Sequence, residues 1–310
     1  MKVAITGANG YIGSSLSRYF LKQGCEVIAI SRKFSETIRK ELTGAEFIIS
    51  DVLSNDFEAL VVSCDVFIHT ASSNDIVSKD FKKGTDLTLY GTKNALTVCV
   101  NNGIKNFVFF STIQVLGTEL KGAYDDNSKP EIESNYAFNH FVAEEYLKYF
   151  VLKNPINGLI IRPANIYGAM LDPGIDRWTL VPNCFCKEAI ENGTITLLSS
   201  GNQNRSFLSL DNICKGTYNS IIQYKDEKLK TLNFANKINY SIVQLAKWTK
   251  EVLEQNFKIP VNLIIKSHQP EKGNQFTIDN SSLLNKNICL EETESNFKNE
   301  VIKIIHSLKK

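Results

Sequence analysis

The chain has 310 residues, of which 43% are hydrophobic, and its formal net charge at pH 7 is +2. This length and composition predict a globular protein with a sizeable core, in one large domain or two unequal ones. The nearly balanced charge argues against a dedicated nucleic-acid-binding or membrane-surface protein, and no apolar run reaches the ~20 residues that a helix needs to cross a bilayer.

The chain opens with a predicted strand, a glycine-rich turn and a helix. The apolar run Val3–Ile5 predicts a buried strand, and Gly7, Gly10 and Gly13 follow it before an amphipathic helix. Glycine adopts positive φ without penalty and lets backbone N–H groups approach a pyrophosphate, while the helix N-terminus adds partial positive charge. This position after the first strand indicates a dinucleotide-binding turn. We expect cofactor contacts from Gly7, Asn9, Gly10, Tyr11, Ile12 and Gly13.

Apolar strand runs then alternate with helical stretches as far as Arg162. Such alternation predicts a parallel sheet with helices on both faces, an α/β fold of the doubly wound Rossmann type. The expected strands are Glu26–Ile30, Glu46–Ile49, Asp65–His69, Asn106–Ser111 and Gly158–Arg162, and the expected helices are 85–102 and 135–153.

Beyond Arg162 the pattern loosens into a loop-rich region marked by proline and glycine. We expect a smaller, mixed α/β substrate domain there, above the carboxyl ends of the sheet strands. Phe207–Leu210 is predicted as a strand that rejoins the first domain, before a helix capped by Asp211. The other expected elements are helices at 179–191, 241–256 and 293–308 and strands at 195–198, Leu232–Ala235 and 261–265. The cofactor domain would comprise 1–163 and about 205–238, and the substrate domain about 164–204 and 239–310.

The end of the second strand selects between NAD and NADP in dinucleotide-binding folds. An acid there hydrogen-bonds the adenosine ribose of NAD, whereas this chain has Ser31, Arg32 and Lys33. Arginine grips a phosphate through paired hydrogen bonds and lysine adds a point charge, so we expect NADP, with NAD as the alternative. An ordinary solvated basic turn is the plainer interpretation. Further cofactor contacts are expected from Asp51, Val52, Thr70, Ala71, Ser72, Ser111 and Pro163, near the ends of other strands.

Motifs along nearly the whole chain resemble those of one enzyme family. Thr6–Gly13 reads TGANGYIG, Arg162–Gly168 reads RPANIYG, and Gly201–Phe207 reads GNQNRSF. With Tyr136 at the start of a helix, these resemble the extended short-chain dehydrogenase/reductase family of nucleotide-sugar epimerases, dehydratases and ketoreductases. The resemblance implies a nicotinamide cofactor, a nucleotide-sugar substrate and hydride transfer at a sugar carbon.

In that family a tyrosine phenol exchanges the hydroxyl proton, a serine or threonine holds the substrate oxygen, and a lysine four residues after the tyrosine lowers the phenol pKa. An unperturbed phenol titrates at about 10, so it needs a neighbouring cation to ionise at neutral pH. The resemblance assigns Tyr136 as the acid/base, Thr112 as the oxygen anchor, and Asn165, Val181 and Arg205 as substrate contacts, with Arg205 on the pyrophosphate.

The lysine position is occupied by His140, which shares a helix face with Tyr136. An imidazole is shorter than a lysine side chain and only partly protonated at neutral pH, so it supplies less positive charge. His140 is a working substitute in a natural reductase, an engineered change, or the mark of a weak or inactive homologue. We expect it to contact the cofactor ribose and to take part in catalysis.

The residues after Thr112 narrow the expected reaction. The family's 4,6-dehydratases carry an Asp-Glu pair there, whereas this chain has Ile113 and Gln114, which disfavours water elimination. The lead expectation is NADPH-dependent reduction of a 4-keto-6-deoxy nucleotide sugar, as in bacterial surface polysaccharide synthesis. A UDP-sugar 4-epimerase with tightly bound NAD is the alternative, and a non-catalytic dinucleotide-binding homologue is the second one.

Other polar residues carry weaker signals. For His69, at the end of the fourth strand, packing or a place near the phosphates is favoured over catalysis. Arg162 is equally compatible with a substrate ligand and a strand-end ion pair. Cys184 and Cys186 form a C-x-C without a second ligand pair, so no metal is expected.

The seven cysteines are scattered and no secretory signal opens the chain, which predicts reduced thiols in a cytoplasmic protein. The family resemblance implies a homodimer formed through the two predicted helices 85–102 and 135–153. We expect neither nucleic acid nor a membrane as a partner.

Overall fold

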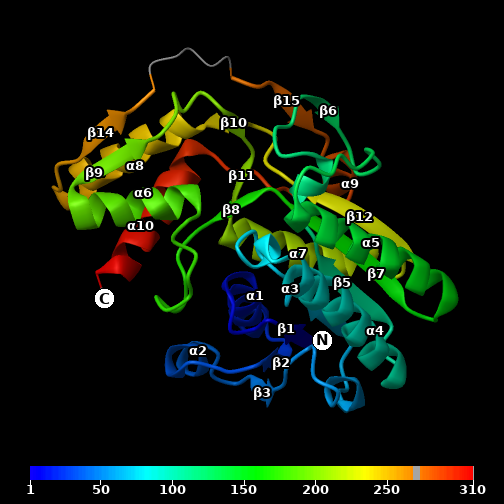
Figure 1. Cartoon of the computed structure of the whole chain (residues 1–310). Helices are drawn as coiled ribbons and strands as arrows, with labels where there is room; N and C mark the ends of the chain where they lie inside the picture. The colour runs from blue at the N-terminus through cyan, green and yellow to red at the C-terminus, as the bar shows by residue number, and fades with distance from the viewer. Residues whose placement is uncertain (268–272, 310) are drawn as a thin grey trace.

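The computed structural model describes residues 1–267 and 273–309. Its main sheet consists of β1 (Lys2–Thr6), β2 (Glu26–Ser31), β3 (Glu46–Ile49), β4 (Val66–His69), β5 (Asn106–Phe110), β7 (Asn157–Pro163) and β12 (Leu229–Phe234). All seven strands are parallel, in the order β12-β7-β5-β4-β1-β2-β3 (Figure 1). The strand order reverses between β1 and β4, and ligands of open α/β sheets bind at the carboxyl side of such a reversal. The predicted Rossmann-type fold is confirmed.

Helices cover both faces of this sheet because successive side chains of a strand point to opposite sides. Val3 and Ile5 pack with one buried cluster, whereas Ala4 packs with the other. The first cluster includes residues of α1 (Tyr11–Lys22) and α7 (Leu210–Tyr224), and the second includes residues of α4 (Gly91–Asn101) and α5 (Asn135–Lys153).

The helix predicted at 85–102 is built from three pieces. It begins as α3 (Phe81–Thr85), widens into a π-helical turn over Asp86–Tyr90, and continues as α4. Within the wide turn, the Thr88 hydroxyl accepts a hydrogen bond of 3.0 Å from the backbone N–H of Ser73, in the loop after β4. The irregular turn therefore fixes that loop at the carboxyl edge of the sheet, a contact that local periodicity does not reveal.

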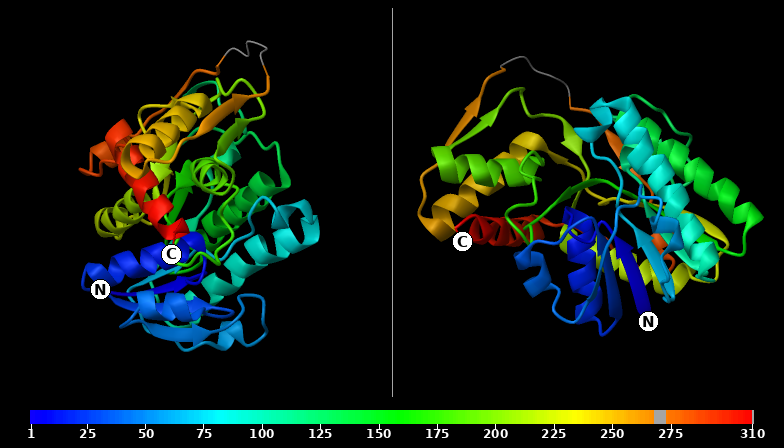
Figure 2. Two further views of the ribbon diagram at one scale, coloured as in Figure 1. Left: turned by 90° about the vertical axis from the view of Figure 1, so that its left-hand side faces the viewer. Right: turned by 60° about the horizontal axis from the view of Figure 1, so that its bottom comes forward.

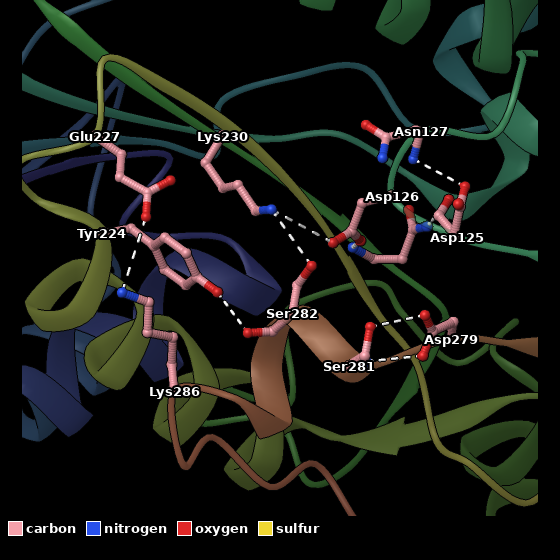
Figure 3. Close-up of polar contacts among 11 residues, drawn as sticks. Asp125, Asp126, Asn127, Tyr224, Glu227, Lys230, Asp279, Ser281, Ser282 and Lys286 are labelled. Carbon is pink, nitrogen blue, oxygen red and sulfur yellow. Dashed lines mark hydrogen bonds and ion pairs between the residues drawn. The ribbon is translucent and has the colours of Figure 1, made fainter.

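The outer strand β12 is covered by segments that are distant in sequence (Figure 3). The backbone N–H of Asn233 donates to the Asp126 carboxylate at 2.8 Å, and Lys230 Nζ lies 3.9 Å from the same carboxylate. Lys230 also donates to the Ser282 hydroxyl at 3.3 Å, and the Tyr224 hydroxyl donates to the Ser282 carbonyl at 2.6 Å. The Asn233 contact satisfies one backbone N–H of an edge strand that would otherwise offer it to another chain.

A second group of elements lies at the carboxyl edge of the sheet (Figure 2). Trp248 and Phe297 lie in its apolar cluster, together with Cys186. Its helices are α6 (Val181–Asn192), α8 (Ile242–Phe257) and α10 (Glu294–Leu308), and strand pairs beside it are β8 (Asn165–Tyr167) with β11 (Phe207–Ser209), and β9 (Thr194–Leu197) with β14 (Asn262–Ile265). The division of the chain into two domains stays a prediction.

One local prediction in this region is confirmed in part and another is wrong. Phe207–Ser209 is a strand, as expected, and it pairs with β8, while Leu208 packs in a buried cluster of the main sheet. Ser209 rather than Asp211 caps α7, because its hydroxyl accepts the hydrogen bond from the backbone N–H of Asn212 at 3.3 Å. Asp211 lies inside the first turn and pairs with Lys303 instead.

Several further short elements lie in the loops between these helices and strands. They are α2 (Glu36–Glu41), α9 (Ser281–Leu284), the pair β6 (Gly122–Tyr124) and β15 (Phe276–Ile278), and the pair β10 (Asn204–Arg205) and β13 (Tyr240–Ser241). No helix within the described ranges is both long and apolar enough to cross a membrane.

Candidate active site

A cavity of about 890 Å³ lies along the carboxyl edge of the sheet, lined by loops that follow β1, β2, β4, β5 and β7. Every residue that the sequence places at the site lines this one cavity. On the cofactor side these are Gly7, Asn9, Gly10, Tyr11, Ile12, Gly13, Ser31, Arg32, Lys33, Asp51, Val52, Thr70, Ala71, Ser72, Ser111 and Pro163. The expected catalytic and substrate residues are Thr112, Tyr136, His140, Asn165, Val181 and Arg205.

The glycine-rich turn is packed too closely for side chains. Gly7 has a φ of 70°, and a Cβ on it would lie 2.7 Å from Thr70 Oγ1. A Cβ on Gly13 would lie 2.3 Å from the carbonyl oxygen of Gly7. Thr70 Oγ1 donates to the Thr6 carbonyl at 2.7 Å, which holds the loops after β1 and β4 together. No side chain caps α1, so backbone N–H groups of its first turn stay available to an anion.

The rim of the cavity at the end of β2 is basic. Arg32 and Lys33 are exposed, and neither forms an ion pair with a described residue. Beside them, the backbone N–H of Ser35 donates to the Asn9 side chain at 3.1 Å. Two unpaired cations therefore stand next to the glycine-rich turn, as a phosphate-binding rim requires.

Thr112 and Tyr136 form a polar pair inside the cavity. Ser134 accepts the backbone N–H of Ala137 at 3.1 Å and so begins α5, which puts Tyr136 in the first turn of the helix. Burial raises the pKa of Tyr136 above its ordinary value, against the smaller lowering effects of a hydrogen bond with Thr112 and of the Arg177 charge. The phenol is therefore protonated at neutral pH and can donate its proton.

His140 is 1% exposed, and both of its ring nitrogens are hydrogen-bonded to uncharged groups. Its Nδ1 lies 2.9 Å from the carbonyl oxygen of Tyr136, and its Nε2 lies 3.2 Å from Ser72 Oγ. A carbonyl only accepts, so Nδ1 carries the proton and Nε2 accepts from Ser72. Burial lowers the pKa of His140 to about 4, which makes the ring neutral at pH 7. His140 thus offers hydrogen bonds but no positive charge.

His69 is fully buried and does not line the cavity. Its Nδ1 lies 2.7 Å from Thr6 Oγ1, and its ring stacks against Phe107 and Phe109. Burial lowers its pKa to about 3, so this ring is also neutral at pH 7. These contacts are those of a packing residue.

Arg162 forms a buried ion pair with Glu144. Its Nε donates to Glu144 Oε1 at 2.9 Å and its Nη2 to Oε2 at 2.5 Å, and Arg162 is 2% exposed. Ser111 also donates to Glu144 Oε1, at 2.5 Å. The sequence left Arg162 open as a substrate ligand or as part of a strand-end ion pair, and in the structure it forms the ion pair. Sequence reasoning missed Glu144, although its place four residues after His140 puts both on one helix face.

Residues 168–180, here called the crossing loop, connect β8 to α6 and lie beside α1 (Figure 1). The Tyr11 hydroxyl donates to the Gly168 carbonyl at 3.0 Å, and Leu171 lies in one buried cluster with Ala8. Arg177 on this loop lines the cavity. Sequence reasoning missed Arg177, and the only signal was that it is the one basic residue between the RPANIYG run and α6.

Curated proteins of known sequence resemble this chain. A putative UDP-glucose 4-epimerase of Methanocaldococcus jannaschii is 25% identical over 242 residues, which are 76% of this chain and 75% of that protein. A dTDP-D-glucose 4,6-dehydratase of Dictyostelium discoideum is 27% identical over 273 residues, which are 79% of this chain and 61% of that protein.

Solved structures share the whole fold. The UDP-glucuronic acid 4-epimerase of Bacillus cereus, in complex with NAD, superposes with a TM-score of 0.82 at 22% identity, over 98% of this chain and 96% of that one. The UDP-glucose 4-epimerase of Thermotoga maritima, with UDP-glucose, gives 0.83 at 18% identity, over 99% of this chain and 100% of that one. The model of the NAD dependent epimerase/dehydratase family matches residues 3–234, and the chain belongs to that family of extended short-chain dehydrogenases/reductases.

Proposed function

We propose that this protein is an NAD(P)-dependent oxidoreductase of nucleotide-linked sugars, and that it reduces a 4-keto-6-deoxy nucleotide sugar with NADPH. The observation that carries the proposal is that the glycine-rich turn and the Thr112–Tyr136 pair line one cavity. Such a cavity combines a site for pyrophosphate with a protonated phenol and a hydroxyl that can hold a carbonyl oxygen.

The residues present fit a dinucleotide. Side chains at Gly7 or Gly13 would collide with neighbouring atoms, so the turn is shaped for backbone approach rather than for side-chain packing. The first-turn N–H groups of α1 would hold the pyrophosphate, Asp51 would lie at the adenine, and Ser72 with His140 would hold a ribose. When bound, the nicotinamide supplies or accepts the hydride.

The chain's own residues manage the proton. Thr112 holds the carbonyl oxygen, and Tyr136 donates its phenolic proton to that oxygen while the carbonyl carbon receives the hydride. The alcohol then leaves, and solvent returns the proton to the phenolate. Because burial disfavours a phenolate, the anion formed on Tyr136 needs a positive partner.

The basic rim supports NADP over NAD. An NAD-binding site of this fold offers an acid at the end of β2, whereas Ser31, Arg32 and Lys33 stand there. A 2′-phosphate would find two unpaired cations. We expect Arg32→Ser to raise the KM for NADPH much more than that for NADH.

Arg205 supports a nucleotide-diphosphate substrate. It is half-buried in the cavity, and no described carboxylate forms an ion pair with it. Burial lowers its pKa, yet a guanidinium stays charged at neutral pH and can bind a pyrophosphate. We propose Asn165 and Val181 as contacts to the remainder of the substrate. The reaction class and the sugar suit bacterial surface polysaccharide synthesis.

The residues after Thr112 favour reduction over dehydration. Ile113 lies in an apolar cluster at 6% exposure, and Gln114 lines the cavity as an uncharged amide. Neither can act as the carboxylate pair that water elimination uses. A 4-epimerase is the second candidate, because the crossing loop contacts the glycine-rich turn and would retain a cofactor that is recycled in place.

A homodimer through α4 and α5 is also proposed. Phe138, Tyr149 and Leu152 on α5 are 40%, 58% and 77% exposed, and Tyr90 just before α4 is 55% exposed. A row of exposed apolar side chains on adjacent helices is typical of an interface. Light scattering should give twice the mass of the chain, and a monomer would contradict this.

Incubation with NADPH and a dTDP- or UDP-4-keto-6-deoxy sugar tests the function. We expect the nicotinamide absorbance to fall as the sugar is reduced, and Arg205→Gln to raise the KM for the sugar much more than that for NADPH. NAD that co-purifies, never exchanges and supports interconversion of UDP-glucose and UDP-galactose would establish the epimerase instead. No turnover of either kind with intact cofactor binding would establish a non-catalytic protein.

A further inference from the structure

We propose that Arg177 is the cationic partner of Tyr136 and takes the place of the lysine that the family carries where this chain has His140. Its guanidinium would stabilise the phenolate that forms when Tyr136 gives up its proton. The inference rests on the proposed function, because only proton transfer at Tyr136 creates that anion. Arg177 would be a positioning residue, since it acts through the phenol and not on the reacting atoms.

Groups from several elements surround Tyr136. On α5 itself, His140 is buried against uncharged partners, and Glu144 is paired with Arg162. The loop after β4 contributes Asp75, an exposed carboxylate that lines the cavity and disfavours the phenolate. Arg177, on the crossing loop, lines the same cavity as Tyr136, and its positive charge favours the phenolate.

The guanidinium of Arg177 is free to serve this role. Its Nη1 donates a long hydrogen bond of 3.4 Å to the Asp176 carbonyl, and no carboxylate of the described residues lies within ion-pair distance. By contrast, the two nitrogens of Arg162 that face Glu144 are bound to its carboxylate. An arginine keeps its charge at any physiological pH, so Arg177 supplies the positive charge that a neutral imidazole lacks.

The crossing loop holds Arg177 in place from both sides. Ile175, Trp178 and Leu180 pack with the buried Tyr11 in one apolar cluster. The Ser35 hydroxyl, in the loop after β2, donates a hydrogen bond to the Asp172 carboxylate. The backbone on either side of Arg177 is therefore fixed, and the side chain gives up less freedom when it faces the phenol.

Spectrophotometric titration of Tyr136 tests the inference without substrate or cofactor. The phenolate absorbance of Tyr136 is the difference between the protein and its Tyr136→Phe variant, since the chain has 11 tyrosines. Loss of a cation raises a phenol's pKa, so Arg177→Gln should move this titration about 1 pH unit higher. Arg177→Lys should keep it near its original value, and His140→Lys combined with Arg177→Gln should restore it.

Kinetics give a second readout. Arg177→Gln should move the pH profile of kcat in the alkaline direction and lower kcat about 10-fold at neutral pH, with the KM for the sugar changed less than about 3-fold. A raised KM with an unmoved Tyr136 titration would overturn the inference and make Arg177 a substrate ligand.

The matched control is Arg32→Gln, which removes an arginine from the same cavity at the β2 rim. It should leave the Tyr136 titration unmoved, and an equal shift in this variant would overturn the inference as a nonspecific effect of net charge. Because the titration needs no turnover, a shift in Arg177→Gln without any reductase activity would refute the proposed function alone. If Arg177→Gln does not fold, an Arg177→Met variant is titrated in the same way, and an unmoved titration there overturns the inference.

Discussion

Ser111 and Thr112 are neighbours at the end of β5, yet they join two very different polar clusters. Ser111 belongs to the ion-pair cluster, with Glu144 and Arg162, which is charged and buried. Thr112 belongs to the phenol cluster, with Tyr136 and His140, which contains no charge at neutral pH and opens on the cavity. Both clusters draw their partners from the same face of α5.

The difference teaches where this fold tolerates charge. A buried carboxylate persists only because a forked guanidinium satisfies both of its oxygens. No charged group is hydrogen-bonded to the phenol or the imidazole of the phenol cluster, so burial keeps both Tyr136 and His140 uncharged. One cluster stabilises the scaffold, and the other holds a proton ready for transfer.

The largest expected effect comes from breaking the ion-pair cluster. Glu144→Gln leaves Arg162 charged and buried without a counter-ion, and we expect the free energy of unfolding to fall by about 3–5 kcal/mol in urea titrations. The adjacent Glu145 is exposed and, among the described residues, forms an ion pair with Lys148 alone. It provides the control, because Glu145→Gln should change the free energy of unfolding by less than about 1 kcal/mol. A small effect at Glu144 would mean that the pair is dispensable.

Removing the phenol should instead affect turnover and spare stability. Tyr136→Phe deletes the proton donor but keeps the ring, so turnover should fall at least ~100-fold while cofactor binding and the unfolding midpoint change little. Tyr149→Phe, at an exposed site on the same helix, should leave turnover intact. A fall in turnover smaller than ~100-fold would show that Tyr136 is not the proton donor.

The neutrality of His140 and His69 should appear as a dependence of stability on pH. Unfolding restores the ordinary pKa of 6.5, so the unfolded chain takes up protons that the folded chain refuses until about pH 4 and about pH 3. The stabilisation is complete above 6.5 and is lost as the pH falls. For each histidine, the free energy of unfolding should fall by about 2 kcal/mol between about pH 7.5 and about pH 5.

Comparison of variants isolates this contribution from that of the carboxylates. His140→Gln should remove one such share of the pH dependence of the free energy of unfolding. Equal pH dependence in the variant and the unchanged protein would show that the buried His140 ring is not kept neutral.

The smallest expected effect is the gain from restoring the family's lysine. His140→Lys adds a cation beside Tyr136, and turnover should rise by less than ~10-fold because Arg177 already supplies charge. His140→Gln keeps a hydrogen-bonding group without charge and should show no gain. Unchanged or lower turnover in the lysine variant would show that the imidazole is the evolved solution.

The sequence predicts what depends on local pattern. The strands of the sheet, the glycine-rich turn and the helix that carries Tyr136 follow from periodicity and end signals, and the residues after each strand meet at one edge because the strands are parallel. Arg177 could not be predicted, since its place depends on how the crossing loop packs against the glycine-rich turn. The pairing of Gly122–Tyr124 with Phe276–Ile278 and the bond between Glu144 and Arg162 likewise join segments that no local pattern connects.

The crossing loop also bears on the rate at which the protein could exchange its cofactor. Leu171 and Ala8 share a buried cluster, and the Tyr11 hydroxyl is bonded to the Gly168 carbonyl, so the crossing loop is tied to the turn where the pyrophosphate would bind. A reductase exchanges its cofactor in every cycle, and wherever that exchange requires these contacts to open, their opening rate would limit its turnover number. An epimerase has no such limit, because its cofactor stays for the life of the molecule.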